Sequence, residues 1–163
     1  MSRRRGLPAA RLEQRAAMAI DRQGTGLTTL RLCLGVFFLF EGIGKLAWLT
    51  NAAILAGRFN GWLADAASGS TSRWYLEHVA VPGVQVFARL VPLGELAAGV
   101  ALILGFWTPL AAFLAFFMVM NIHVASGALF KMSFLTNGYG LPVVGGTLAL
   151  AIGGIRLPFS LKR

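Results

Sequence analysis

Two ionisable residues interrupt a strongly apolar stretch near the beginning of the chain. Glu41 and Lys45 lie in LRLCLGVFFLFEGIGKLAW, residues 30–48. Their spacing of four places both on one face of a helix, with the acid nearer the amino terminus, which is the favourable order for an ion pair. Each ion alone costs about 2.5–3.5 kcal/mol inside hydrocarbon. This cost suggests that the pair has a function, and an acid beside a base can hold and exchange protons. The simpler alternative is that Lys45 extends to the membrane surface and Glu41 follows it.

Other polar residues occur in later apolar runs, and their depths can be compared. At 1.5 Å per residue, Glu95 falls near the centre of its run, while Asn121 and His123 lie roughly 6 and 9 Å past the middle of theirs. If the first run crosses outward, these residues and the acid–base pair all lie toward the outer half of the membrane. Ionisable residues inside a membrane are functional candidates by default, although polar contacts that only hold helices together are a serious alternative. The candidate catalytic residues are Glu95, Glu41 and Lys45, and the candidate cofactor-binding residues are Asn121, His123 and Arg31.

Several kinds of catalytic and metal site are absent from the sequence. It contains no nucleophile elbow, phosphate loop or zinc signature. Cys33 is the single cysteine, and the two histidines, His78 and His123, lie on different segments. We therefore expect no metal, haem or flavin in this chain. The remaining groups suit hydrogen bonding or proton exchange with an amphipathic guest. A quinone fits, because its reduction couples electrons to protons and its tail prefers lipid.

The elements that must position these residues are membrane-spanning helices. Of the 163 residues, 56% are hydrophobic and 13% are charged, which is typical of a small integral membrane protein and not of a soluble domain. Four runs have nearly the roughly 20 residues that a bilayer core requires. Their predicted ranges are 27–49, 84–105, 107–126 and 138–155. Backbone groups in lipid must be satisfied within the segment, so the sequence predicts an all-α, four-helix membrane bundle spanning 27–156.

The basic residues predict an orientation. The segment 1–26 carries six arginines and the tail 157–163 is also basic, so both termini are expected on the cytoplasmic side of the cell inner membrane. The connection from 50 to 83 is then extracytoplasmic, and its apolar periodicity predicts a short interfacial helix with Phe59 and Trp62 in the head-group layer. The net charge of +9 comes largely from these flanks, which attract anionic lipids, and no nucleic-acid binding is expected.

Two stretches of the chain resemble a known family. RLCLGVFFLFEGIGKL resembles the R-L-x-L-G-x-x-F-x-x-x-G-x-x-K-L opening of DoxX-like membrane proteins, and PLGELAAGVALILGFWTPLAA resembles their Gly-Glu signature. The resemblance implies a four-helix membrane protein. The family includes the DoxD-like small subunit of thiosulfate:quinone oxidoreductase, which passes electrons from a sulfur compound to quinone. The matching positions are Arg31, Gly35, Gly42, Lys45, Leu46, Gly94, Glu95 and Gly99. The family is functionally heterogeneous, so the resemblance assigns no catalytic roles.

Three functions are compatible with these features. The first is a membrane subunit of a quinone-linked oxidoreductase, of the thiosulfate:quinone type, with a polar intramembrane site and a second oxidoreductase subunit as partner. The alternative is a non-catalytic scaffold that anchors or assembles soluble oxidoreductases in the membrane. A small transporter is less favoured, because four helices form a pathway only if the chain forms a homo-oligomer.

Overall fold

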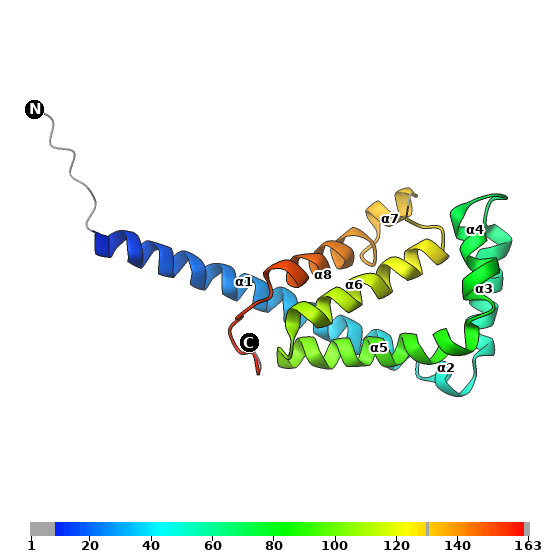
Figure 1. Cartoon of the computed structure of the whole chain (residues 1–163), viewed down its shortest axis with the longest axis horizontal. Coiled ribbons are helices and arrows are strands. Elements are labelled where there is room, and N and C mark those ends of the chain that lie inside the picture. Colours follow the sequence, from blue (N-terminus) through cyan, green and yellow to red (C-terminus); the bar gives the residue numbers. More distant parts are fainter. Residues whose placement is uncertain (1–8, 130, 162–163) are drawn as a thin grey trace, which may run out of the picture.

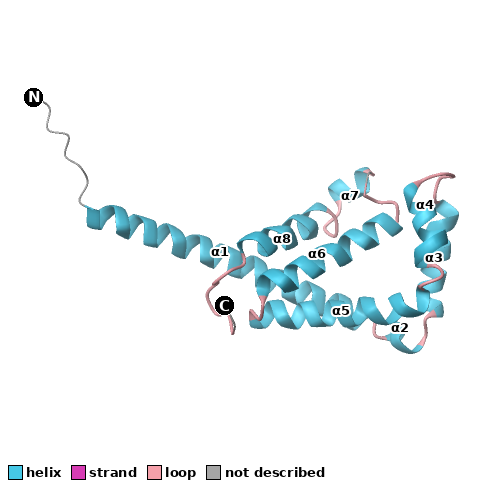
Figure 2. Ribbon diagram, in the orientation of Figure 1, coloured by secondary structure: helices cyan, strands magenta, loops and turns pink. Residues whose placement is uncertain are grey.

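Within the described residues, the chain is built from helices and their connections. The computed structural model describes the backbone of residues 9–129 and 131–161, and the side chains from residue 22 onward within those ranges. No strand occurs in these ranges, so the all-α prediction is confirmed (Figure 2). The predicted basic segments 1–26 and 157–163 lie partly outside the described residues.

Four helices form the bundle. They are α1 (Ala9–Gly44), α5 (Val84–Leu104), α6 (Thr108–Ala125) and α8 (Leu141–Gly153). The largest contacts are between α1 and α5 and between α6 and α8, and α5 also packs on α6 (Figure 1). The amino-terminal part of α1 extends well beyond the other three helices. A continuous bundle therefore forms only over the later part of α1, where the acid–base pair lies.

Among the described residues, three helical segments are long and apolar enough to cross a membrane: Arg22–Thr50, which includes the later part of α1 and the short helix after it, Val84–Leu104 and Thr108–Ala125. The second and third begin and end close to their predicted limits. The fourth, α8, has 13 residues and is shorter than the predicted range 138–155. It rises only about 20 Å, compared with a hydrocarbon core of about 30 Å. The short helix α7 (Met132–Thr136) and a turn, in which Asn137 Oδ1 accepts a hydrogen bond from Gly140 N–H, occupy the sequence before it.

Glycines allow α1 and α5 to approach each other closely. A methyl group at Gly99 would lie 2.5 Å from the backbone nitrogen of Leu39 and 3.0 Å from the carbonyl oxygen of Gly35. A methyl group at Gly42 would lie 2.9 Å from the backbone nitrogen of Leu96. These contacts involve backbone atoms that cannot move aside, so a larger residue would separate the helices. The close approach brings the end of α1 beside the middle of α5.

Three short helices cover one end of the bundle, which we call the capped end. They are α2 (Ala47–Thr50), α3 (Ala53–Asp65) and α4 (Thr71–Tyr75), and α4 continues into a π-helical segment at Leu76–Ala80. In Figure 1, α3 and α4 run across the ends of the bundle helices. The structure therefore contains a helix in the connection where one was predicted.

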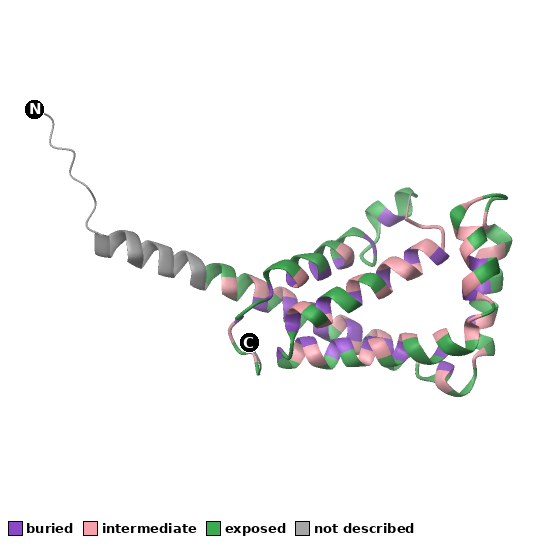
Figure 3. Ribbon diagram, viewed as in Figure 1, coloured by how far each residue is buried: buried purple, intermediate pink, exposed green. Residues whose placement is uncertain are grey.

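The apolar face of α3 points into the protein. Leu55 and Phe59 are buried in one cluster with Trp48, Ala88 and Ala125, and the ring of Phe59 meets that of Phe87 edge-on at 6.3 Å. Figure 3 shows buried positions along the helices of the capped end. Phe59 was predicted in the head-group layer and lies in this cluster instead. The reason is that the capped end exposes apolar side chains that α3 can cover, and burial removes more apolar surface from water than the interface would.

The opposite end, which we call the tail end, is closed by the carboxyl-terminal residues. Leu157 is buried in the bundle core, and Leu161 N–H donates to the carbonyl oxygen of Leu104 at 3.2 Å. The hydroxyl of Thr28 lies 3.5 Å from the carbonyl oxygen of Pro158. The tail is thus fastened to both α1 and α5.

Candidate functional site

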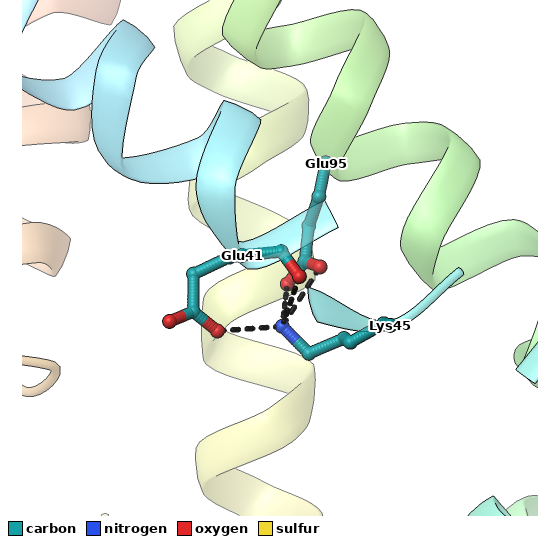
Figure 4. Close-up of polar contacts among 3 residues, drawn as sticks. All are labelled: Glu41, Lys45 and Glu95. Atoms are coloured by element: carbon teal, nitrogen blue, oxygen red, sulfur yellow. Dashed lines mark hydrogen bonds and ion pairs between the residues drawn. The ribbon is translucent and has the colours of Figure 1, made fainter. Parts of the chain in front are cut away.

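Lys45 is the centre of a buried cluster of three charges, Glu41, Lys45 and Glu95, which we call the triad. Its Nζ donates to Glu41 Oε2 at 2.7 Å and to both carboxylate oxygens of Glu95 at 2.8 Å (Figure 4). Glu41 and Lys45 come from the end of α1, and Glu95 comes from the middle of α5. The structure therefore brings together the three residues that were predicted as catalytic candidates, although 50 positions separate Glu95 from Lys45.

The backbone at Lys45 explains how its side chain reaches α5. The amide of Lys45 bonds the carbonyl of Gly42 at 3.1 Å, and the amide of Leu46 bonds that of Ile43 at 3.2 Å. This i→i+3 spacing is tighter than that of an α-helix and marks the end of α1. Lys45 thus lies at a break between α1 and α2, and its ammonium group points toward Glu95.

The three charges differ in their exposure. The exposed fraction of the side chain is 4% for Glu95, 12% for Lys45 and 31% for Glu41. Short bonds between charged groups offset the cost of taking such groups out of water, and removing one partner leaves an uncompensated buried charge. The triad therefore forms a continuous hydrogen-bonded path from a buried carboxylate to a partly exposed one.

A cavity of about 330 Å³ lies against the triad. All three triad residues line it, together with aromatic side chains from the bundle and the capped end: Phe38, Trp48, Phe59, Trp62, Phe87 and Tyr139. Its volume lies within the range of small-molecule sites, which are mostly apolar with a few polar groups. Such a cavity can take a ring and present it to an acid and a base.

Asn121 lies on the wall of the same cavity. Its Nδ2 donates to the hydroxyl of Tyr75 at 2.6 Å. Tyr75 is in α4, so this bond joins α6 to the cap. The structure places Asn121 on the same cavity as the triad, as its depth along the predicted helix indicated. Its orientation is fixed by Tyr75, which was not predicted as a site residue.

His123 is two residues further along α6 and lies on a different side. It is buried, its Nε2 is 2.9 Å from the carbonyl oxygen of Tyr139, and its ring meets that of Phe134 edge-on at 5.0 Å. It does not line the triad cavity. It lines a second cavity of about 640 Å³ together with residues such as Ser72 and Lys131. The structure therefore separates His123 from the triad.

Arg31 lies at the tail end, far along α1 from the triad. It is 1% exposed, and its guanidinium donates to Ser160 Oγ at 2.5 Å and to the carbonyl oxygen of Phe159 at 3.0 Å. Its Nε is buried without a hydrogen-bond partner among the described residues. Arg31 lines no part of the triad cavity, and its contacts hold the carboxyl-terminal tail.

Three residues at the site were not predicted from the sequence: Trp48, Tyr75 and Arg58. Trp48 and Arg58 line the cavity, and Tyr75 orients Asn121. A signal for Arg58 was present, because Arg58 shares a helical face with Leu55 and Trp62, at spacings of three and four. A cation on an otherwise apolar face of a predicted helix deserved to be a candidate.

The groups that can hold a guest are the triad, Asn121 and the aromatic walls. In the part of the chain that the structure describes, no three His, Cys, Asp or Glu residues lie together as a metal site. The arrangement supports hydrogen bonding and proton exchange with a small molecule that has an apolar ring or tail.

The family comparison covers the part of the chain that contains the triad. The model of the DoxX family matches residues 26–128. This is more than half of the chain and includes α5, the later part of α1 and all three triad residues. The chain belongs to the DoxX family. No curated protein and no solved structure matches it. The DoxX match, with three helices able to cross a bilayer, makes this a membrane protein.

Proposed function

We propose that this DoxX-family protein is a membrane subunit of a quinone-linked oxidoreductase, and that the triad cavity binds the quinone head group. One observation carries the proposal: a buried acid–base–acid cluster forms the wall of an aromatic cavity within a membrane bundle. The apolar walls suit the ring, and the charged wall supplies hydrogen-bond donors and protons. A quinone requires both, because it dissolves in lipid and takes up protons when it is reduced.

The residues of the triad have distinct tasks in this proposal. A bound quinone takes up two electrons and two protons and becomes a quinol. Lys45 donates a hydrogen bond at the cavity wall, and Glu95 takes up a proton during turnover and passes it to the reduced quinone. Glu41 is the most exposed member of the triad and exchanges protons with water. Protons thus pass along the hydrogen bonds from Glu41 through Lys45 to Glu95, each within 2.8 Å of the next.

The electrons come from a reduced donor, directly or through a second subunit. The DoxX-like family includes the small subunit of thiosulfate:quinone oxidoreductase, so thiosulfate or a thiol is the donor to test. Joining two thiosulfate ions through a new sulfur–sulfur bond releases two electrons and no proton. Both protons of the quinol must then enter through the protein, and this is the task that the triad would perform.

The second candidate function is the membrane scaffold. It is favoured by the position of the triad beside the closest backbone packing of α1 and α5. Fixed charges at such a place can specify which helices pair without any chemistry. The scaffold hypothesis requires a stable soluble partner but no quinone at the cavity.

The test is quinone reduction by membrane vesicles that contain the protein, with thiosulfate or a thiol as the donor. Glu95→Gln keeps the shape of the side chain and removes its ability to hold a proton, so turnover should fall by about 100-fold or more. Glu77→Gln makes the same chemical change in an exposed ion pair with Arg73, and should alter turnover by less than about twofold. Full turnover by correctly inserted Glu95→Gln would contradict the proton role. Copurification of an intact soluble partner by that variant, with no quinone reduction by the wild type, would favour the scaffold.

A further inference from the structure

Two cations line the triad cavity, and only one of them is neutralised. Lys45 is bonded to two carboxylates. Arg58, on α3, is exposed and forms no hydrogen bond or salt bridge within the described residues. A guanidinium group is always charged and presents several donors in one plane. Arg58 is therefore the cation of this cavity that has donors free for a guest.

The indole of Trp48 holds Arg58 in place. The guanidinium carbon of Arg58 lies 5.3 Å from the centre of the Trp48 ring, and the Nζ of Lys45 lies 5.9 Å from the centre of the same ring. Cations at this distance are attracted to an aromatic face. This contact uses none of the N–H groups as hydrogen-bond donors to another described residue, so they are available to a guest. Both cations consequently lie near one aromatic ring on the wall of one cavity.

The charges of the cavity determine how an anion would orient. With both carboxylates ionised, the triad has one more negative charge than positive charge. An anionic oxygen is repelled from the triad and attracted to Arg58. A guest with one acidic oxygen and one neutral carbonyl therefore has a preferred orientation, with the acidic oxygen on Arg58 and the carbonyl near Lys45.

We propose that Arg58 is a binding residue for an anionic oxygen on the head of the guest, and that it makes the cavity selective for acidic hydroxyquinones over neutral quinones. The proposal rests on the proposed function, since it takes the guest to be a quinone. It extends that function by assigning the head-group chemistry that the site prefers. The bidentate geometry of the guanidinium fits the ionised hydroxyl oxygen and the carbonyl oxygen next to it, and the carbonyl on the opposite side of the ring is the one that lies near Lys45.

The test compares two probes of nearly equal shape. A 2-hydroxy-3-alkyl-1,4-naphthoquinone is ionised at neutral pH, and its 2-methoxy analogue is neutral. Binding to the purified full-length protein in phosphatidylcholine nanodiscs is measured by calorimetry and by quenching of tryptophan fluorescence. The wild type should bind the hydroxy compound about tenfold more tightly than the methoxy compound. Arg58→Gln should bind the two equally, Arg58→Lys should give an intermediate ratio, and Arg73→Gln should behave as the wild type.

The two probes distinguish the failure of this proposal from the failure of the proposed function. Equal binding of both probes by the wild type, or an unchanged ratio in Arg58→Gln, would overturn the role of Arg58 and leave a quinone site intact. Failure of the wild type to bind either probe would overturn the quinone site itself. Since Arg58 is exposed and forms no hydrogen bond or salt bridge within the described residues, its substitution should leave the fold unchanged, and an unchanged thermal midpoint checks this.

Discussion

The two ends of α1 within the bundle each bury a cation, and they differ in what surrounds it. At the capped end, Lys45 meets two carboxylates on the wall of a cavity. At the tail end, Arg31 meets the Ser160 hydroxyl and the Phe159 carbonyl, which are neutral groups of the carboxyl-terminal tail. Both residues match the same family signature, so a matching position alone does not indicate chemistry. The groups around each cation determine whether it can take part in chemistry. Of the two ends, only the capped end combines acids, a base and space for a guest.

The choice of residue fits each environment. The planar guanidinium of Arg31 reaches two acceptors at once and can hold a segment of chain. The ammonium group of Lys45 is compact and donates in three directions, which lets it contact both carboxylates. We therefore interpret Arg31 as a residue that fastens the tail, and Lys45 as the link between two acids. Substitutions at the two ends of the bundle test whether Arg31 and Lys45 have these different roles.

The largest loss of stability is expected from Lys45→Met. This change leaves the buried carboxylate of Glu95 and the partly exposed carboxylate of Glu41 without a cation, and removing one member of a buried ion pair costs about 3–5 kcal/mol. Arg73→Gln is the matched control, because it removes a cation from the exposed pair with Glu77 and should cost less than about 1 kcal/mol. Unfolding in detergent measures both. Equal losses in the free energy of unfolding would mean that the ion pairs of Lys45 stabilise the protein no more than the exposed pair of Arg73 and Glu77.

Gly99→Ala should destabilise both the capped end and the tail end of the bundle, because Gly99 lies where α1 and α5 are closest. The added methyl group would meet the backbone of Leu39, and forced overpacking costs about 1–3 kcal/mol. Gly145→Ala in α8 has no atom within 4 Å of the new methyl group and should be neutral or slightly stabilising. If thermal unfolding shows the same midpoint for both variants, the close approach of the helices is not required.

Arg31→Gln should loosen the tail and leave the cavity unaffected. Loss of two hydrogen bonds from a charged donor should cost about 2 kcal/mol. Hydrogen exchange should become faster in residues 157–161, and the affinity for a neutral quinone should change by less than about twofold. A large loss of quinone affinity with no change in the exchange of the tail would reverse the roles that we assign to the two ends.

Much of this fold follows from the hydropathy of the sequence. Long apolar runs must be helical in lipid, and their ends gave the limits of α5 and α6 closely. The limits of α8 depended on local signals that a hydropathy count does not include. Pro142 lies in its first turn and Gly154 follows its last residue, and the helix is correspondingly short.

The site was predicted in part, because depth along a helix is easier to infer than direction around it. Asn121 and His123 have similar depths, but two residues rotate a helix by about 200°, so they face opposite sides. This rotation takes His123 out of the triad cavity. The contribution of Arg58 depends on how α3 folds over the bundle, and this packing lies between segments that are distant in sequence.

Photoaffinity labelling with an azidoquinone in nanodiscs, followed by peptide mapping, tests directly whether a quinone binds beside the triad. The label should attach at the capped end, in peptides that contain Phe38, Trp48 or Phe87, and excess unlabelled quinone should prevent this labelling. The aromatic residues of the tail end, Trp107 and Phe159, serve as an internal comparison, since both are exposed. Labelling only at the tail end, or labelling that excess quinone does not reduce, would contradict a quinone site beside the triad.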